Sequence, residues 1–283
     1  VITSSDVIGT EVFYNVILNN NFNTTTSNNL IAQGDLTVNA TKTLTVKPND
    51  YVQVNNKLQL NGDMIIENDG QLIQVNETDT NAGTYTGTKF QVKRIAEARD
   101  IDYIYWASPV ENFAVTNLPY SSRYEWNPTA TNANSTQGNW ITPSGNMVKG
   151  KGYIARASNG SSTIVDLPIT FQGGKPFNGQ FNHSISRGFT TGTDDCWNLV
   201  GNPYPSAIDA DLFLIDNANI EGSVRIWMHG TLPASIPSPF YQNFAYNYSP
   251  NDYILYNGTA TSIPAVFNGK IGSGQGFFVR MLE

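Results

Sequence analysis

The chain has 283 residues, of which 40% are hydrophobic and only 14% charged, and its formal net charge is −7 at pH 7. So few charged residues argue against long exposed helices, and an acidic chain argues against a nucleic-acid partner. Apolar runs stay far below the ~18 residues of a membrane-spanning helix, so we expect no membrane insertion. A single cysteine, Cys196, cannot form an internal disulfide, which favours a bacterial export route for a secreted chain.

Residues 1–80 are predicted to form a short parallel β-solenoid. Between residues 30 and 76, short segments alternate apolar and polar side chains, so each segment has one face to bury. Residues 12–18 show the same pattern and form an earlier rung. Because a solenoid of a few rungs has an open end, the start of the chain at Val1 suggests that further rungs or another domain precede it.

The period of the alternation distinguishes a coil of parallel strands from a chain of hairpins. Equivalent apolar positions recur about every 21 residues, which is typical of three strands in each solenoid rung. We therefore expect Leu36 to stack on Leu58, and Leu44 to lie near Ile65. An antiparallel meander, in which each strand pairs with its neighbour in the chain, is the alternative.

A polar bridge at residues 81–88 separates the solenoid from two related β units. The first unit is predicted to span residues 89–170 and the second residues 171–283. Proline and aromatic residues are frequent near residues 230–251, and this segment is predicted to be an insertion in the second unit. We expect the two units to form a duplicated β-sandwich module, which makes the whole chain all-β.

The duplication is indicated by motifs that the two units share. Each unit closes on the pattern Gly-polar-Gly-aromatic-apolar-apolar-Arg, at residues 150–156 and at residues 274–280. Each unit opens with an apolar strand, a small residue and a proline, which is Pro109 in the first and Pro203 in the second. Glycine-rich turns of this kind bind phosphate when a helix follows them, but strands are predicted after both.

One short helix is predicted, at residues 205–213. Asp209, Asp211 and Asp216 lie in and after this segment, and they are the best candidate metal ligands in the chain. Calcium is the metal that such a group suits, because it takes several oxygen ligands. The alternative role of Asp209 and Asp211 is to stabilise the start of the helix. No other cofactor is expected.

Two motifs of the second unit resemble a known family. The run Trp-Asn-Leu-Val-Gly-Asn-Pro-Tyr-Pro-Ser at residues 197–206, followed by Gly-Ser-Gly-Gln-Gly-Phe-Phe-Val at residues 272–279, resembles a block in large exported proteins of Bacteroidetes-type bacteria. That block lies shortly before a C-terminal sorting domain for type IX secretion. Residues 13–16 and 34–38 resemble the repeats of the same proteins, but the sorting domain is missing after Val279. The resemblance implies a secreted or outer-surface location and no shared catalytic residues.

Aromatic side chains are the candidate ligand-binding groups, since sugars stack on exposed rings. Trp106, Trp126, Trp197 and Trp227 fall in alternating strands and are expected to belong to the core. Aromatic residues of loops and of the insertion are better candidates. These candidate ligand-binding residues are Trp140, Tyr241, Phe244, Tyr246 and Tyr248.

The chain is therefore predicted to be a non-catalytic structural or adhesive module at the cell surface, within a larger exported protein. Carboxylates are sparse, and no acid–base pair can be assigned, so enzymatic activity is not expected. The expected partners are glycans or other surface components and further domains of the same polypeptide. The alternative is an accessory carbohydrate-binding region of an exported polysaccharide-active enzyme.

Overall fold

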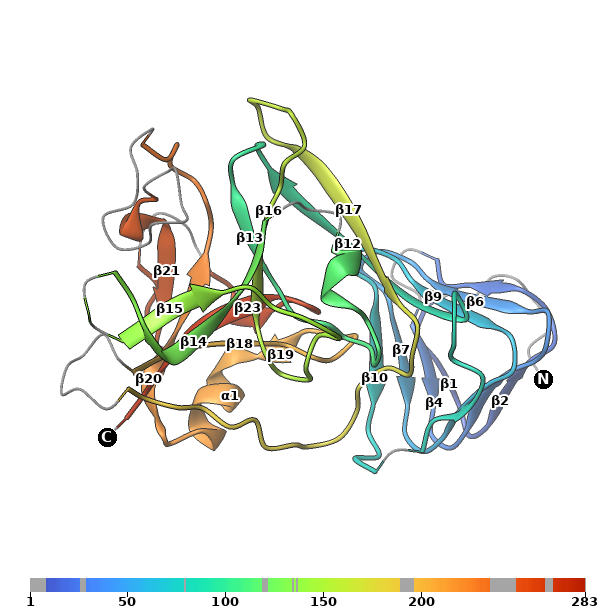
Figure 1. The fold of residues 1–283 in the computed structure, drawn as a ribbon. Coiled ribbons are helices and arrows are strands. Elements are labelled where there is room, and N and C mark those ends of the chain that lie inside the picture. Colours follow the sequence, from blue (N-terminus) through green and yellow to red (C-terminus); the bar gives the residue numbers. More distant parts are fainter. Residues whose placement is uncertain are drawn as a thin grey trace.

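The computed structural model describes residues 9–25, 29–78, 80–118, 122–133, 135, 137–188, 196–234, 248–262 and 267–282. A three-sided parallel solenoid of about three turns leads into two antiparallel sheets, so the all-β class is as predicted (Figure 1). The helical elements of the described residues are η1 (Val115–Asn117), α1 (Ala210–Asp216) and η3 (Pro250–Asp252).

Three sheets form the sides of the solenoid. The first contains β1 (Glu11–Phe13), β4 (Leu30–Ala32), β7 (Tyr51–Val54) and β10 (Gln71–Gln74). The second contains β2 (Val16–Leu18), β5 (Leu36–Val38), β8 (Leu58–Leu60) and β11 (Ala82–Gly83). The third contains β3 (Phe22–Asn23), β6 (Thr43–Val46), β9 (Asp63–Ile66), β12 (Phe90–Ala98) and β17 (Val165–Gln172). All neighbouring strands in these sheets are parallel except β12 and β17. The predicted coil of parallel strands is therefore confirmed, and the alternative of an antiparallel meander is excluded for these strands.

The strand register agrees closely with the predicted period. Leu36 pairs with Leu58, as expected. Leu44 pairs with Met64 and is therefore one position from Ile65, because the corner between the second and third sheets shortens from residues 39–42 to residues 61–62. Leu44 and Met64 both point into the core and have no exposed surface.

Asparagine side chains fix the corners of the solenoid. Asn15 Oδ1 accepts the backbone N–H of Asp35 (2.8 Å), which lies in register with it one rung later. Asn21 Oδ1 accepts the N–H of Thr43 (3.0 Å) in the same way. These bonds satisfy amides that the strand ladders do not reach, which explains the asparagine-rich linkers.

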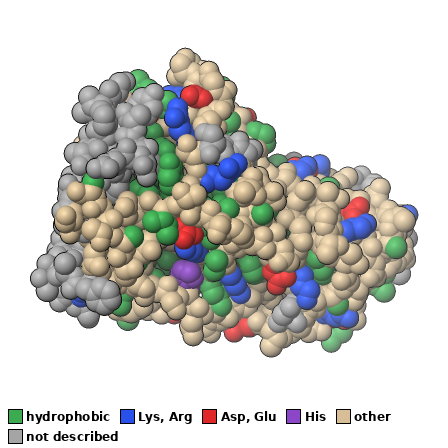
Figure 2. All heavy atoms as spheres, in the orientation of Figure 1, with side chains coloured by type: hydrophobic (Ala, Val, Ile, Leu, Met, Phe, Trp, Pro, Cys, Tyr) green, Lys and Arg blue, Asp and Glu red, His purple; other side chains and the backbone are tan. Residues whose placement is uncertain are grey.

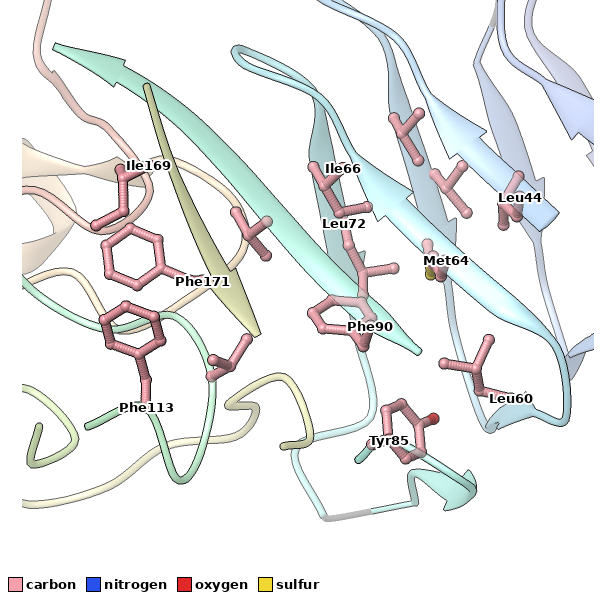
Figure 3. Close-up of a cluster of buried hydrophobic side chains, with 14 of the residues drawn as sticks. Leu44, Leu60, Met64, Ile66, Leu72, Tyr85, Phe90, Phe113, Ile169 and Phe171 are labelled. Atoms are coloured by element: carbon pink, nitrogen blue, oxygen red, sulfur yellow. The ribbon is translucent and has the colours of Figure 1, made fainter. Parts of the chain in front are cut away.

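The solenoid and the first antiparallel sheet share one hydrophobic core. β12 pairs with β9 through its first residues and with β17 along nearly its whole length. Figure 3 shows Met64, Phe90, Phe171 and Phe113 following one another from the solenoid to the region beyond β17. Phe113 and Phe171 lie with ring centroids 4.8 Å apart. A single cluster of buried residues therefore crosses the predicted boundary between solenoid and sandwich.

The two antiparallel sheets have the same topology, which confirms the duplication. The first contains β13 (Tyr103–Trp106), β16 (Tyr153–Arg156), β14 (Arg123–Thr131) and β15 (Gln137–Ile141), in this order. The second contains β18 (Trp197–Gly201), β23 (Gly276–Met281), β20 (Ile220–Trp227) and β21 (Tyr253–Tyr256). In both, the strand that comes first in the chain pairs with the last, and the last pairs with the second. A two-stranded sheet of β19 (Ile208–Asp209) and β22 (Lys270–Ile271) completes the fold.

Candidate functional site

The two antiparallel sheets pack face to face through aromatic side chains, which we call the aromatic interface. Its members are Tyr103, Tyr105, Tyr124, Trp126, Trp140, Trp197, Trp227, Tyr248, Tyr253 and Phe278. The indole N–H of Trp126 donates to the carbonyl oxygen of Trp197 (2.7 Å), and that of Trp227 donates to the carbonyl of Tyr103 (2.9 Å). Trp126 and Trp227 occupy equivalent positions in the two sheets, so these two bonds are reciprocal.

Backbone contacts across the aromatic interface repeat this twofold relation. The N–H of Ala107 donates to the carbonyl of Gly274 (2.7 Å), and the N–H of Gly201 donates to the carbonyl of Gly150 (3.0 Å). Ala107 directly follows the opening strand β13 and Gly201 ends the opening strand β18, whereas Gly150 and Gly274 precede the closing strands. The duplicated units therefore associate like the halves of a symmetric dimer.

The shared glycine motif is explained by this close association. Gly150 and Gly274 both have positive φ angles, of 76° and 68°, which glycine adopts without strain. The second glycine of each motif lies against the opening strand of the other unit. A Cβ atom on Gly152 would lie 2.5 Å from Leu199 Cγ, and one on Gly276 would lie 3.1 Å from Tyr105 Cβ. The motif thus serves packing between the units.

The structure places Trp140 and Tyr248 in the aromatic interface, where both are half-buried. The Trp140 ring lies 5.0 Å from that of Trp126 and 6.0 Å from that of Phe278. The hydroxyl of Tyr248 donates to the carbonyl of Ile101. Tyr241, Phe244 and Tyr246 lie outside the described residues. The two described candidates therefore have structural contacts, and ligand binding by them stays a prediction.

Protein groups pack against two of the interface rings, those of Trp197 and Trp126. The guanidinium of Arg225 lies 4.1 Å above the Trp197 ring. Gly138 lies so close to the Trp126 ring that an added Cβ would be 2.7 Å from Trp126 Cζ2. These contacts occupy part of the ring surface on which a sugar would stack.

Two of the three candidate metal ligands, Asp209 and Asp211, have protein partners. Asp209 caps helix α1, where its Oδ1 accepts the N–H groups of Asp211 (2.9 Å) and Leu212 (3.1 Å). Its other oxygen pairs with Lys270, and this hydrogen bond, followed by that from Leu212, lowers the pKa of Asp209. Asp211 accepts a hydrogen bond from the hydroxyl of Tyr256 (2.6 Å), and Asp216 is exposed at the end of the helix. The role in the helix start is confirmed, and calcium binding stays a prediction.

Charged groups elsewhere form pairs. Arg99 and Asp102 make the most deeply buried ion pair among the described residues, with Arg99 Nε 2.8 Å from Asp102 Oδ2. Lys151 pairs with Glu125 at 3.0 Å. Burial, and then the charge of Lys151, lower the pKa of His183 below its ordinary value of 6.5.

Within the described ranges no group of three His, Cys, Asp or Glu side chains is placed to hold a metal ion, and no helix is long and apolar enough to cross a membrane.

The second unit also binds the last rung of the solenoid, at a contact that we call the cap seat. The N–H of Leu72, which points away from β7, donates to the carbonyl of Pro205 (2.9 Å). The N–H of Ala207 donates to Oε1 of Gln71 (3.0 Å). β10 is the outermost strand of its sheet, so the loop at residues 202–207 covers its free edge. These bonds hold the residues before Ile208 outside a helix, which is why α1 begins at Ala210 rather than near residue 205.

Asn202 gives this loop its shape. Its side chain has no exposed surface. Its Nδ2 donates to the carbonyls of Ser206 (2.7 Å), Ile271 (3.0 Å) and Gly272 (3.1 Å), and its Oδ1 accepts the N–H of Tyr204 (2.9 Å). Every hydrogen-bonding group of the amide is engaged, so the loop is held in one conformation.

The strap at residues 173–188, which leads from the first unit to the second, extends the cap seat. Nδ2 of Asn178 donates to the carbonyl of Asn76 (2.7 Å) beyond β10. Lys149 Nζ donates to the carbonyl of Asn178 (3.0 Å) and lies 4.3 Å from the centre of the Phe181 ring. A cation above an aromatic face is attracted to it, so Lys149 helps to hold the strap.

The Asn-Pro-Tyr-Pro run at residues 202–205 is recognisable in the sequence, but the sequence does not indicate which residues it contacts. Leu72 and Pro205 are far apart in the chain, and a carbonyl acceptor has no side-chain signature. The signal that was available is the run itself, because two prolines around one residue restrict a loop to few conformations.

Comparisons with known proteins identify one family. The sequence model of a family described as "Domain of unknown function (DUF8693)" matches residues 8–283. The match runs through the solenoid, the strap and both units. No curated protein and no solved structure matches the chain.

Proposed function

The chain belongs to the family DUF8693, and we propose that it is a non-catalytic structural module whose duplicated sandwich caps the end of a β-solenoid. The observation that carries the proposal is the cap seat, where the carbonyl of Pro205 accepts a hydrogen bond from the N–H of Leu72 at the edge of β10. A location at the cell surface, within a larger exported protein, rests on the family resemblance of the sequence motifs.

Each of the three solenoid sheets is closed in its own way at this end. The edge of β10 is covered by the loop at the cap seat. The third sheet ends in the antiparallel strand β17, whose Pro168 has no N–H to offer to a further strand. The second sheet ends in the two-residue strand β11, and the hydroxyl of the following Tyr85 donates to the carbonyl of Leu58 (2.9 Å). Open sheet edges recruit other chains, so their closure keeps a solenoid from unspecific association.

The surface composition supports a structural role. In the described part of the face in Figure 2, neutral polar side chains and backbone predominate, and acidic and basic groups are dispersed between them. A dispersed pattern gives no focused field for a charged substrate or for nucleic acid.

Carbohydrate binding is the second candidate function, and the half-buried rings of Trp140 and Tyr248 favour it. A screen of the full chain against a glycan array distinguishes the two proposals. Specific binding that Trp140→Ala or Tyr248→Ala abolishes, with folding retained, would favour the carbohydrate proposal over a purely structural role.

A fragment that lacks the cap tests the leading proposal. Residues 1–98 end with β12 and lack both β17 and the loop at the cap seat. We expect this fragment to self-associate in light scattering, at concentrations at which the full chain is monomeric, because the edges of β10 and β12 are then free.

The control is the same fragment with Ile73→Lys, which places a charge on the free strand β10 and should reduce association. A fragment that stays monomeric and as stable as the solenoid of the full chain would contradict the proposal.

A further inference from the structure

The other end of the solenoid is built differently. β1, β2 and β3 are the outermost strands of the three sheets, and they lie at the end far from the antiparallel sheets (Figure 1). Their sequences contain no proline. Among the described residues, each of these strands pairs only with the next rung. The closing devices of the cap seat, β17 and β11 have no counterpart in this described part of the chain.

Two backbone amides at this end have no acceptor among the described residues, although the equivalent amides of the next rung have one. In the second rung, the amides of Asp35 and Thr43 donate to Asn15 and Asn21 of the first rung. The equivalent donors of the first rung are the N–H groups of Asn15 and Asn21 themselves. Neither makes a hydrogen bond within the described residues. A side-chain oxygen one rung earlier would satisfy each of them.

Apolar side chains are unusually exposed in the same rung. Val12 is 50% exposed, Ile17 is 42% exposed and Tyr14 is 74% exposed. Ile31 and Thr37 stand next to Val12 and Ile17 in the ladders, and both are half-buried because a strand lies on each side of them. The exposure of the first rung therefore goes with a strand on only one side of it in the described part of the chain.

We propose that β1, β2 and β3 receive one further rung of the same parallel β-solenoid. The fitting segment alternates apolar and polar residues and carries Asn or Asp at its corners, with side-chain oxygens that accept the N–H groups of Asn15 and Asn21. The ladders and corner bonds of the existing rungs continue without change into this rung, so the interface already present defines its partner. The inference rests on the proposed function, in which the duplicated sandwich closes the opposite end of the solenoid.

An extended chain tests this inference. A copy of residues 34–50, which contains β5 and β6, replaces residues 1–9 directly ahead of Thr10. In register, Leu36 of the copy then lies beside Val16, and Asp35 of the copy lies beside Asn15. In hydrogen exchange followed by NMR, we expect the amides of Asn15 and Ile17 to exchange about tenfold or more slowly than in the unextended chain.

Two control variants separate the contributions. Asp35→Ala in the copy removes the corner oxygen and should abolish the slowing at Asn15 while that at Ile17 remains. Leu36→Asp in the copy prevents packing and should abolish both. Unchanged exchange of both amides in the extended chain would overturn the inference, as would a dimer of the unextended chain through β1 to β3. These results are independent of the cap, since the fragment of residues 1–98 reports on the opposite edges.

Discussion

At the scale of single residues, Asn202 shows how a neutral side chain can fix a loop that joins two parts of the molecule. Its amide hydrogens face three backbone carbonyls, from the loop itself and from the segment around β22. Asparagine is needed here rather than aspartate, because a carboxylate only accepts hydrogen bonds. Its negatively charged oxygen would repel the carbonyl oxygens to which the amide donates. The conformation of this one residue sets where Pro205 meets the solenoid.

We expect Asn202→Asp to lower the free energy of unfolding by about 3–5 kcal/mol, because it leaves a buried charge without a partner. Asn202→Ala should cost about 1–3 kcal/mol, since the carbonyls then lose their donor. Urea unfolding followed by tryptophan fluorescence measures both. Asn182→Asp, at an exposed position of the strap, is the matched control and should be nearly neutral. Equal stability of the two aspartate variants would contradict the assigned role of Asn202.

At the scale of elements, the aromatic interface joins two sheets that are related by duplication. The two reciprocal indole bonds cross it in opposite directions, and the Gly-x-Gly motifs let the opening strand of one unit approach the closing turn of the other. Trp140 and Tyr253 are equivalent in the strand pairs, as partners of Trp126 and Trp227. This equivalence predicts that the same change in the two units has the same effect.

Trp126→Phe and Trp227→Phe should each lower the free energy of unfolding by about 1–3 kcal/mol, because each leaves a backbone carbonyl without its donor. Thermal and urea unfolding of the two variants should give values within about 0.5 kcal/mol of one another, a spread typical of independent sites. Trp140→Phe is the matched control, since its indole makes no hydrogen bond within the described residues, and it should cost less. A neutral change in one unit and a severe one in the other would refute the twofold relation.

At the scale of the whole molecule, the solenoid and the first antiparallel sheet are not separated by a break in the core. The cluster that begins at Val16 and Leu18 continues through Phe90 to Phe171 and Tyr153. The predicted domain limits near residues 80 and 89 therefore mark a change in the strand pattern and do not interrupt the hydrophobic core.

Phe90→Ala tests the coupling between the parts. Phe90 is fully buried at the start of β12, where the solenoid leads into the sandwich. We expect a loss of about 3–5 kcal/mol. Native-state hydrogen exchange should show this loss both in β9 of the solenoid and in β13 of the first antiparallel sheet. A loss confined to β9 would mean that the solenoid unfolds on its own.

The sequence by itself determined the elements whose signals are local or periodic. Alternation with a period near 21 residues predicted the coil and the pair Leu36 and Leu58, and the repeated Gly-x-Gly closings predicted two equivalent sheets. A role of Asp209 and Asp211 at a helix start was one of the two roles that the sequence offered for them. Each of these signals lies within a few residues or repeats along the chain, so sequence inspection can find it.

Only the tertiary structure decided where these elements meet. The short corner at residues 61–62 determines that Leu44 pairs with Met64. The packing of the two antiparallel sheets brings aromatic residues from loops and from strands together in one interface. The contact between Leu72 and Pro205 joins a backbone donor to a backbone acceptor far along the chain, and backbone groups are the same at every position. Such contacts depend on how the whole chain packs, which is why the cap seat could not be predicted while the solenoid that it closes could.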